Sequence, residues 1–205
     1  MSKVKIEGNS SGTGTFTLTT PNSNTDRTFT LPDATGDLLT STSSVGKILQ
    51  VVSNNVDTIA SYLIDSETPD TTQQIAALDT SITPTASDSK ILLTFSFCGE
   101  GHHDSVFRLF RGNTEIGRTT QSTAQWAGFK PASYDTNSDS TPENYHFVYV
   151  DEPATTSAVT YNIRISESNN TNGIFRLNRA VTGTDAGALR YEIGTSQVIL
   201  MEIGA

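Results

Sequence analysis

The stretch Lys90-Ile-Leu-Leu-Thr-Phe-Ser-Phe-Cys98 decides the fold of this chain. Every second side chain from Ile91 to Phe97 is apolar, so these side chains fall on one face of an extended strand. The intervening positions, Leu92, Thr94 and Ser96, fall on the opposite face. One buried and one partly polar face is typical of a strand in a two-layer antiparallel sandwich. Cys98 is predicted to be a small buried side chain at the strand end.

Similar strand patterns recur on both sides of this stretch, roughly 10–15 residues apart, and no helical period exceeds about two turns. Tight turns are predicted at Asn54-Asn55 and at Gly112-Asn113, each joining two strands into a hairpin. The other predicted strands are residues 47–53, 56–64, 75–83, 106–111, 114–117, 145–151, 158–166, 174–178 and 197–203. The sequence therefore predicts an all-β chain.

The last predicted strand, residues 197–203, is apolar on both faces, as in a strand buried in mid-sheet or between subunits. Eight or more antiparallel strands that begin and end in apolar stretches fit a two-sheet, jelly-roll-like sandwich. We assign this domain to residues 46–205. Because such an apolar final strand suits a symmetry axis, we expect a homotrimer.

The composition changes near residue 45, before which Thr, Ser, Gly, Asn and Asp dominate. Within residues 1–45 the phrase Thr-Phe-Thr-Leu occurs twice, at 15–18 and 28–31. Alternation predicts a two-stranded β-ribbon with one apolar face, and such a ribbon is marginal in water alone. It is expected to anchor onto the downstream domain, onto ribbons of neighbouring subunits or onto another protein. The predicted anchoring residues are Phe16, Leu18, Phe29 and Leu31.

Charge and hydropathy exclude several classes of partner. The chain of 205 residues has 13 basic and 22 acidic side chains, a formal charge of −9, which is the wrong sign for nucleic acid and anionic membranes. Its apolar runs are far shorter than the ~20 residues that span a bilayer. No secretory signal is evident at the N-terminus, so synthesis in a cytoplasm is expected.

Two segments near the N-terminus carry a family resemblance. Residues 15–21 followed by 27–39, with the core Leu-Pro-Asp-Ala-Thr-Gly at 31–36, resemble a segment of tail-fibre-like and other virion structural proteins of tailed bacteriophages. The resemblance covers about residues 12–45 and implies an anchoring segment N-terminal to a distal β domain, with no catalytic residue. The remaining chain is similar, in architecture only, to jelly-roll heads of the C1q and tumour-necrosis-factor type.

The sequence contains no recognisable catalytic motif, so we expect a non-enzymatic protein without a cofactor. The densest polar cluster is Gly-Glu-Gly-His-His-Asp at 99–104. His102, His103 and Asp104 are competent metal ligands, although adjacent residues of an extended chain point to opposite sides. The alternative is a polar loop whose glycines permit a sharp turn.

A long polar connection, residues 121–144, is the candidate ligand or receptor site, because loops of this length in compact domains are commonly functional. Aromatic rings beside amides and carboxylates suit the apolar face and the hydroxyls of a sugar. The alternative is that Trp126 and Phe129 are ordinary core or interface residues on an unrecognised strand. The candidate residues are Trp126, Phe129, Tyr134, Asp135 and Asn137.

Two functions are compatible with these features. The first is a structural component of a tailed-phage virion, an oligomeric fibre, spike or capsid-decoration protein anchored to other virion proteins by its N-terminus. The second is a module that binds a receptor or glycan on the host surface.

The second half of the chain also holds most of the arginines, and these are expected to pair with acids across strands or subunits.

Overall fold

The computed structural model describes residues 10–15, 17, 19, 21–28, 30, 47–64, 72–101, 105–119, 127–132, 142–167, 173–180 and 192–205. The chain separates into two compact units, Met1–Thr40 and Ser41–Ala205. In the described residues of the first unit the backbone forms turns, bends and irregular segments and no strand. The Thr25 N–H donates to the Ser23 hydroxyl (3.2 Å), a turn that this composition favours. The predicted anchoring residues Phe16, Leu18, Phe29 and Leu31 lie outside the described residues.

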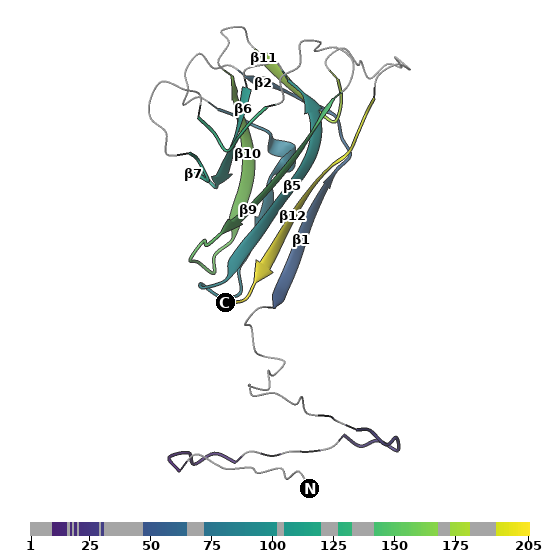
Figure 1. The fold of residues 1–205 in the computed structure, drawn as a ribbon, viewed down its shortest axis with the longest axis vertical. Coiled ribbons are helices and arrows are strands. Elements are labelled where there is room, and N and C mark those ends of the chain that lie inside the picture. The colour runs from purple at the N-terminus through teal and green to yellow at the C-terminus, as the bar shows by residue number, and fades with distance from the viewer. Residues whose placement is uncertain are drawn as a thin grey trace. The chain divides into compact units, whose positions relative to one another are not determined.

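The second unit is a β-sandwich (Figure 1). Its strands are β1 Ile48–Val56, β2 Ala60–Ile64, β3 Gln73–Gln74, β4 Thr80–Ile82, β5 Lys90–Glu100, β6 Ser105–Arg111, β7 Thr114–Ile116, β8 Lys130–Pro131, β9 Glu143–Asp151, β10 Val159–Glu167, β11 Gly173–Leu177 and β12 Ser196–Ile203, with a 3₁₀ turn, η1, at Ala76–Leu78. The described residues include no helix long and apolar enough to cross a membrane.

The strands form two antiparallel sheets. The first has β12 between β1 and β5, with β9 on the far side of β5, and β11 and β2 extending it beside the end of β5. The second has β3 and β4 beside β10, then β6, then β7 and β8. Eight principal strands can be counted in chain order: β1, β3 with β4 as one broken strand, β5, β6, β7, β9, β10 and β12. In this count the strand order is 1-8-3-6 in the first sheet and 2-7-4-5 in the second. This is jelly-roll order, and it confirms the predicted all-β sandwich.

The core lies between the inner faces of the two sheets. The alternating side chains of β5 from Ile91 to Phe97 are at most 2% exposed, as the sequence predicts. They meet aromatic rings from the neighbouring and the opposite strands, and the closest ring pair, Phe107 and Tyr145, has centroids 4.7 Å apart. Edge-to-face packing of such rings adds to the free energy of burial. The aromatic cluster comprises Phe97, Phe107, Tyr145, Phe147 and Phe175.

The predicted hairpin turn at Asn54-Asn55 is wrong, because β1 runs without interruption to Val56. The Asn54 side chain points inward and its amide donates to the carbonyls of Ala77 (2.9 Å) and Asp79 (3.2 Å). An inward amide with two acceptors is compatible with a strand interior, so the dipeptide does not need to turn. In place of β1, β2 pairs with β11.

The predicted strand at residues 75–83 is also interrupted. Gln73–Gln74 and Thr80–Ile82 pair with β10, and the 3₁₀ turn Ala76–Leu78 separates them. Ile75, directly before this turn, and Leu78, its last residue, are both fully buried, so the turn rather than strand alternation buries them. The predicted hairpin at Gly112-Asn113 is confirmed, and Gly112 has the positive φ (59°) that such a turn requires.

A buried carboxylate lies at one end of the first sheet. Glu202 on β12 is fully buried and accepts hydrogen bonds from Gln50 Nε2 (2.6 Å) and from the Thr85 backbone N–H (2.7 Å) and hydroxyl (2.8 Å). Burial by itself would raise the pKa of Glu202, but these donors favour the charged form and lower the pKa to about 2. The carboxylate thus ties the loop before β5 to both β1 and β12.

At the opposite end of the same sheet, Asn178 joins four segments. This fully buried residue has a positive φ of 63°, which Asn tolerates better than most residues. Its amide donates to the carbonyls of Val56 and Thr58 (both 2.9 Å), and its Oδ1 accepts from the Ser196 hydroxyl (2.5 Å). Its backbone N–H donates to the Cys98 carbonyl (2.9 Å). The ends of β1, β5 and β12 are therefore held in one hydrogen-bonded network.

Candidate functional site

One of the predicted binding residues, Phe129, lies among the described residues. Its ring packs edge-on against Phe147 (5.6 Å between centroids) and Tyr149 (5.8 Å), and its backbone N–H donates to the Phe107 carbonyl (2.8 Å). It directly precedes β8, a short strand that the sequence analysis did not recognise. Phe129 is thus a partly exposed residue at the edge of the core, and its role in ligand binding stays a prediction.

The other predicted site residues lie outside the described part of the chain. These are Trp126, Tyr134, Asp135 and Asn137 of the long connection and His102, His103 and Asp104 of the proposed metal cluster. Within the described ranges no group of three His, Cys, Asp or Glu side chains is placed to hold a metal ion.

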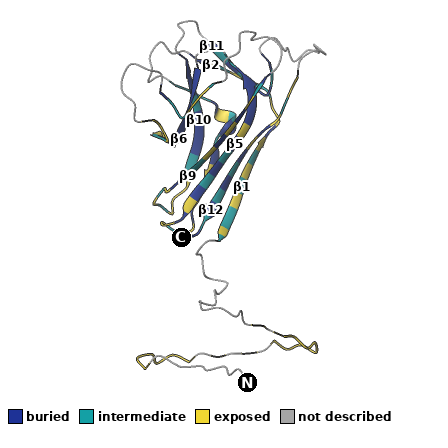
Figure 2. Cartoon of the chain, in the orientation of Figure 1, coloured by how far each residue is buried: buried dark blue, intermediate teal, exposed yellow. Residues whose placement is uncertain are grey.

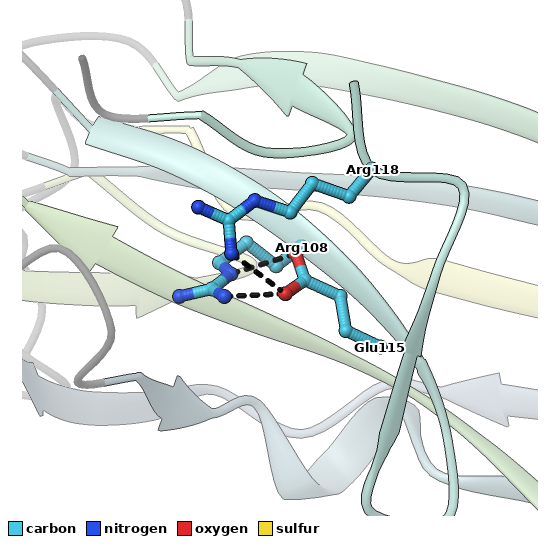
Figure 3. Close-up of polar contacts among 3 residues, drawn as sticks. All are labelled: Arg108, Glu115 and Arg118. Atoms are coloured by element: carbon cyan, nitrogen blue, oxygen red, sulfur yellow. Dashed lines mark hydrogen bonds and ion pairs between the residues drawn. The ribbon is translucent and has the colours of Figure 1, made fainter. Parts of the chain in front are cut away.

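An arginine–carboxylate cluster lies at the β6–β7 hairpin (Figure 3). Arg108, on β6 and 4% exposed, binds Glu115 of β7 through two nitrogens, with Nε to Oε1 at 2.8 Å and a second contact from Nη2 to Oε2. Arg118 also reaches Glu115 Oε2 at 3.4 Å. The planar fork of a guanidinium fits a carboxylate in this two-point manner. The cluster stabilises the pairing of β7 with β6, which agrees with the predicted pairing of arginines with acids across strands.

A second arginine is stacked on the same sheet. The Arg164 guanidinium carbon lies 4.1 Å from the centroid of the Phe110 ring, and its nitrogens donate to the Gly112 carbonyl (3.1 Å) and to Asn113 Oδ1 (3.0 Å). A cation over a ring face at this distance is stabilised by the ring quadrupole. These contacts hold Arg164 against the hairpin turn, so it acts as a structural group in this arrangement.

The outer face of the first sheet is the largest feature that the sequence analysis did not assign. Strand register places its outward residues in four rows across the sheet. From the end of β12 toward its start, the first row contains Ile48, Ile203 and Lys90, and the second contains Val51, Met201, Leu92 and Val150. The third row contains Ser53, Ile199, Thr94 and Val148, and the fourth contains Asn55, Gln197, Ser96 and His146.

These rows change from apolar to polar along the strands. The second row is apolar on all four strands, the third is half apolar, and the fourth is wholly polar. Several of the apolar side chains are strongly exposed, with Val51 at 55%, Val148 at 51% and Val150 at 49%. Figure 2 shows exposed and intermediate segments along β1. We call the apolar residues of the first three rows the apolar face: Ile48, Val51, Leu92, Val148, Val150, Ile199, Met201 and Ile203.

The apolar face carries almost no charge. Across the four rows Lys90 is the one residue with a full charge, and it pairs with Glu152 (2.8 Å) beyond the end of β9. The chain has a formal charge of −9, so its excess of carboxylates lies outside these four rows. The signal was present in the sequence, because residues 197–203 are apolar on both faces, but the contributions of β1 and β9 became visible only with the strand register.

A polar hollow of about 340 Å³ lies beyond the fourth row, where β1 ends and β12 begins. Val56 and Ser196, which belong to the Asn178 network, are its buried lining residues. The residues that line it are Asn55, Val56, Asp57, Ser96, Thr195, Ser196 and Gln197.

The two layers and the strand order define the second unit as a jelly-roll β-sandwich. No family model matches the sequence, and no curated protein matches it. Among solved structures, the VP2 subviral particle of infectious bursal disease virus is similar at 14% identity and a TM-score of 0.34, over 76% of this chain and 42% of VP2. A mutant VP2 of the same virus, in derived T=1 particles, is similar at 14% identity and a TM-score of 0.33, over 76% of this chain and 41% of that one.

The chain thus spans less than half of the VP2 chains to which it is similar. The jelly-roll assignment is based on the strand order rather than on this likeness.

Proposed function

We propose that the protein is a structural, non-enzymatic component of a tailed-phage virion, an oligomeric fibre, spike or decoration unit. Its β domain associates with copies of itself, and residues 1–45 anchor it to other virion proteins. The resemblance of residues 12–45 to virion structural proteins supports the anchoring role. The apolar face is the single observation that carries the self-association.

The size of the apolar face suits the centre of a protein interface. Strands about 4.8 Å apart and same-face residues about 6.8 Å apart give each position about 33 Å², so the eight residues of the apolar face cover roughly 260 Å². Exposed apolar patches of a few hundred Å² on a monomer are often functional. A standard interface buries about 800 Å² per partner, with an apolar centre and a polar rim. The Lys90–Glu152 pair would form part of that rim.

The charge distribution favours a second copy of this chain as the occupant. Two subunits that each carry −9 repel one another unless their carboxylates lie away from the contact. Across the four rows no carboxylate faces outward, so joining two such faces brings no carboxylates together. We propose a trimer, in which the central strand β12 lies near the symmetry axis.

Solution mass tests the self-association. Light scattering of the full-length chain over a range of concentrations should give the mass of three subunits. Val150→Lys should yield a monomer with an unchanged far-ultraviolet circular dichroism spectrum, because an unpaired ammonium at an apolar contact costs several kcal/mol, about a hundredfold or more in affinity. His146→Lys, on the polar row of the same strand, is the matched control and should stay trimeric.

A wild-type monomer at every concentration would contradict the proposal, as would a Val150→Lys chain that keeps the wild-type mass. Mass spectrometry of purified particles, with detection of this chain, would separate a virion component from another self-associating β-sandwich.

A second candidate function, attachment to a receptor or glycan on the host surface, is favoured by the polar hollow.

A further inference from the structure

The polar hollow is bounded by three neighbouring strands of the first sheet. Strand register places Asn55 of β1, Gln197 of β12 and Ser96 of β5 side by side in the fourth row. Asp57 and Thr195 complete the wall from the segments that leave β1 and precede β12. The volume of about 340 Å³ lies within the range of small-molecule sites, roughly 300–1,000 Å³.

The floor of the hollow is rigid. Ser196 is 3% exposed, and its hydroxyl donates to Asn178 Oδ1 (2.5 Å) and accepts from the Cys98 backbone N–H (3.2 Å). Val56, 5% exposed, holds its carbonyl against the Asn178 amide (2.9 Å). A site whose floor is fixed before binding loses little conformational entropy when a ligand enters.

The walls present hydrogen-bonding groups of both kinds. Gln197 Nε2 donates to Asn55 Oδ1 (2.6 Å), which fixes both amides and leaves Gln197 Oε1 as an acceptor and Asn55 Nδ2 as a donor. The Ser96 and Thr195 hydroxyls can donate or accept. Asp57 is the one charged residue of the seven that line the hollow, so an anionic ligand would be repelled and a neutral one would not.

We infer that this hollow binds a neutral polyhydroxylated ligand, a saccharide unit, through the fixed amides and hydroxyls of the fourth row. This inference deepens the second candidate function, on which it rests, and does not depend on self-association. Among the described residues that line the hollow none is aromatic, so hydrogen bonds rather than ring stacking supply the affinity and fix the ligand's orientation.

Saturation-transfer NMR on the full-length chain tests the inference. The probes are glucose, galactose and mannose, with glucuronate as an anionic counterpart. At least one neutral hexose should bind, and glucuronate should bind more weakly. Gln197→Ala should weaken binding about two- to tenfold, since a net hydrogen bond contributes about 0.5–1.5 kcal/mol and 1.4 kcal/mol is tenfold. Ser53→Ala, on the adjoining row but outside the hollow, should bind as the wild type does.

Thr195→Val provides a second variant that removes one hydroxyl and keeps the side-chain shape. The inference is overturned if no neutral hexose binds, if both Gln197→Ala and Thr195→Val bind normally, or if glucuronate binds as tightly as the neutral sugars. The Val150→Lys monomer should retain sugar binding. A wild-type chain that is monomeric at every concentration but binds sugar would therefore count against self-association alone.

Discussion

Glu202→Gln should remove a large part of the acid sensitivity of folding. The Glu202 carboxylate is fully buried and accepts hydrogen bonds from Gln50 Nε2 and from the N–H and hydroxyl of Thr85. A glutamine of the same shape would turn its NH₂ group toward one of these donors. That leaves a buried donor unsatisfied, which costs about 1–3 kcal/mol by itself.

The size of the effect follows from linkage. The pKa of Glu202 falls from its ordinary value of 4.5 to about 2 in the folded protein, which corresponds to about 3 kcal/mol of stability at neutral pH. Because the folded pKa is the lower one, this contribution is complete above about pH 5 and is lost as the pH falls toward 2. A domain of this size has a total stability of about 5–15 kcal/mol, so the variant should still fold.

Urea unfolding followed by circular dichroism, at one fixed subunit concentration and at several values between neutral pH and pH 2, provides the assay. Glu202→Gln should be about 3 kcal/mol less stable than the wild type at neutral pH, and the difference should shrink to below about 1 kcal/mol near pH 2. Glu152→Gln, at an exposed acid of the same end, is the control and should change little. A stability difference that stays constant across this pH range would refute the reasoning.

Two further substitutions test other buried contacts. Gly194→Ala should destabilise the fold, because a Cβ at this position would lie 2.3 Å from the Cys98 sulfur, and the double variant with Cys98→Ala should recover part of the loss in thermal melting. If the second change gives no recovery, the clash is not the cause. Tyr161→Phe should cost about 1.5–3 kcal/mol in urea unfolding, since its hydroxyl donates to the buried, charged Asp151 (2.7 Å). Equal stability of Tyr161→Phe and the wild type would show that this bond makes no net contribution.

The sequence contains enough information to predict the strands with strong alternation. In β5 and β10 the apolar positions recur every second residue, and the side chains of Tyr161, Ile163 and Ile165 are fully buried as expected. The Gly112-Asn113 turn was predictable because a positive φ at glycine is a local requirement. Where local chemistry decides the structure, the prediction holds.

The prediction fails where a distant contact decides. Asn54 is a favourable turn residue by itself, yet two carbonyls some 25 residues along the chain hold it in a strand. The break in the strand after Gln74 depends on the burial of Ile75 and Leu78 against the core. An alternating pattern of apolar residues in the sequence does not reveal such a break.

The candidate surfaces were less predictable than the fold for the same reason. The apolar face combines residues of four strands that are far apart in the sequence, and its outline depends on register. The polar hollow likewise joins the end of β1 to the start of β12. By contrast, the local spacing of Arg108 and Glu115 on one hairpin could be anticipated.

The antiparallel pairing of β1 with β12 also determines how the sandwich bears mechanical load. Both strands meet at one end, where Ile48 pairs with Ile203 and the Gly204 N–H donates to the Lys47 carbonyl (2.8 Å). Tension between these two points would peel the ladder one hydrogen bond at a time. Tension between Lys47, directly before β1, and Ser196 at the start of β12, which lie at opposite ends of the ladder, would instead shear the whole β1–β12 ladder at once. A sandwich held through its N-terminal side and pulled at its far loops is therefore loaded in its stronger direction.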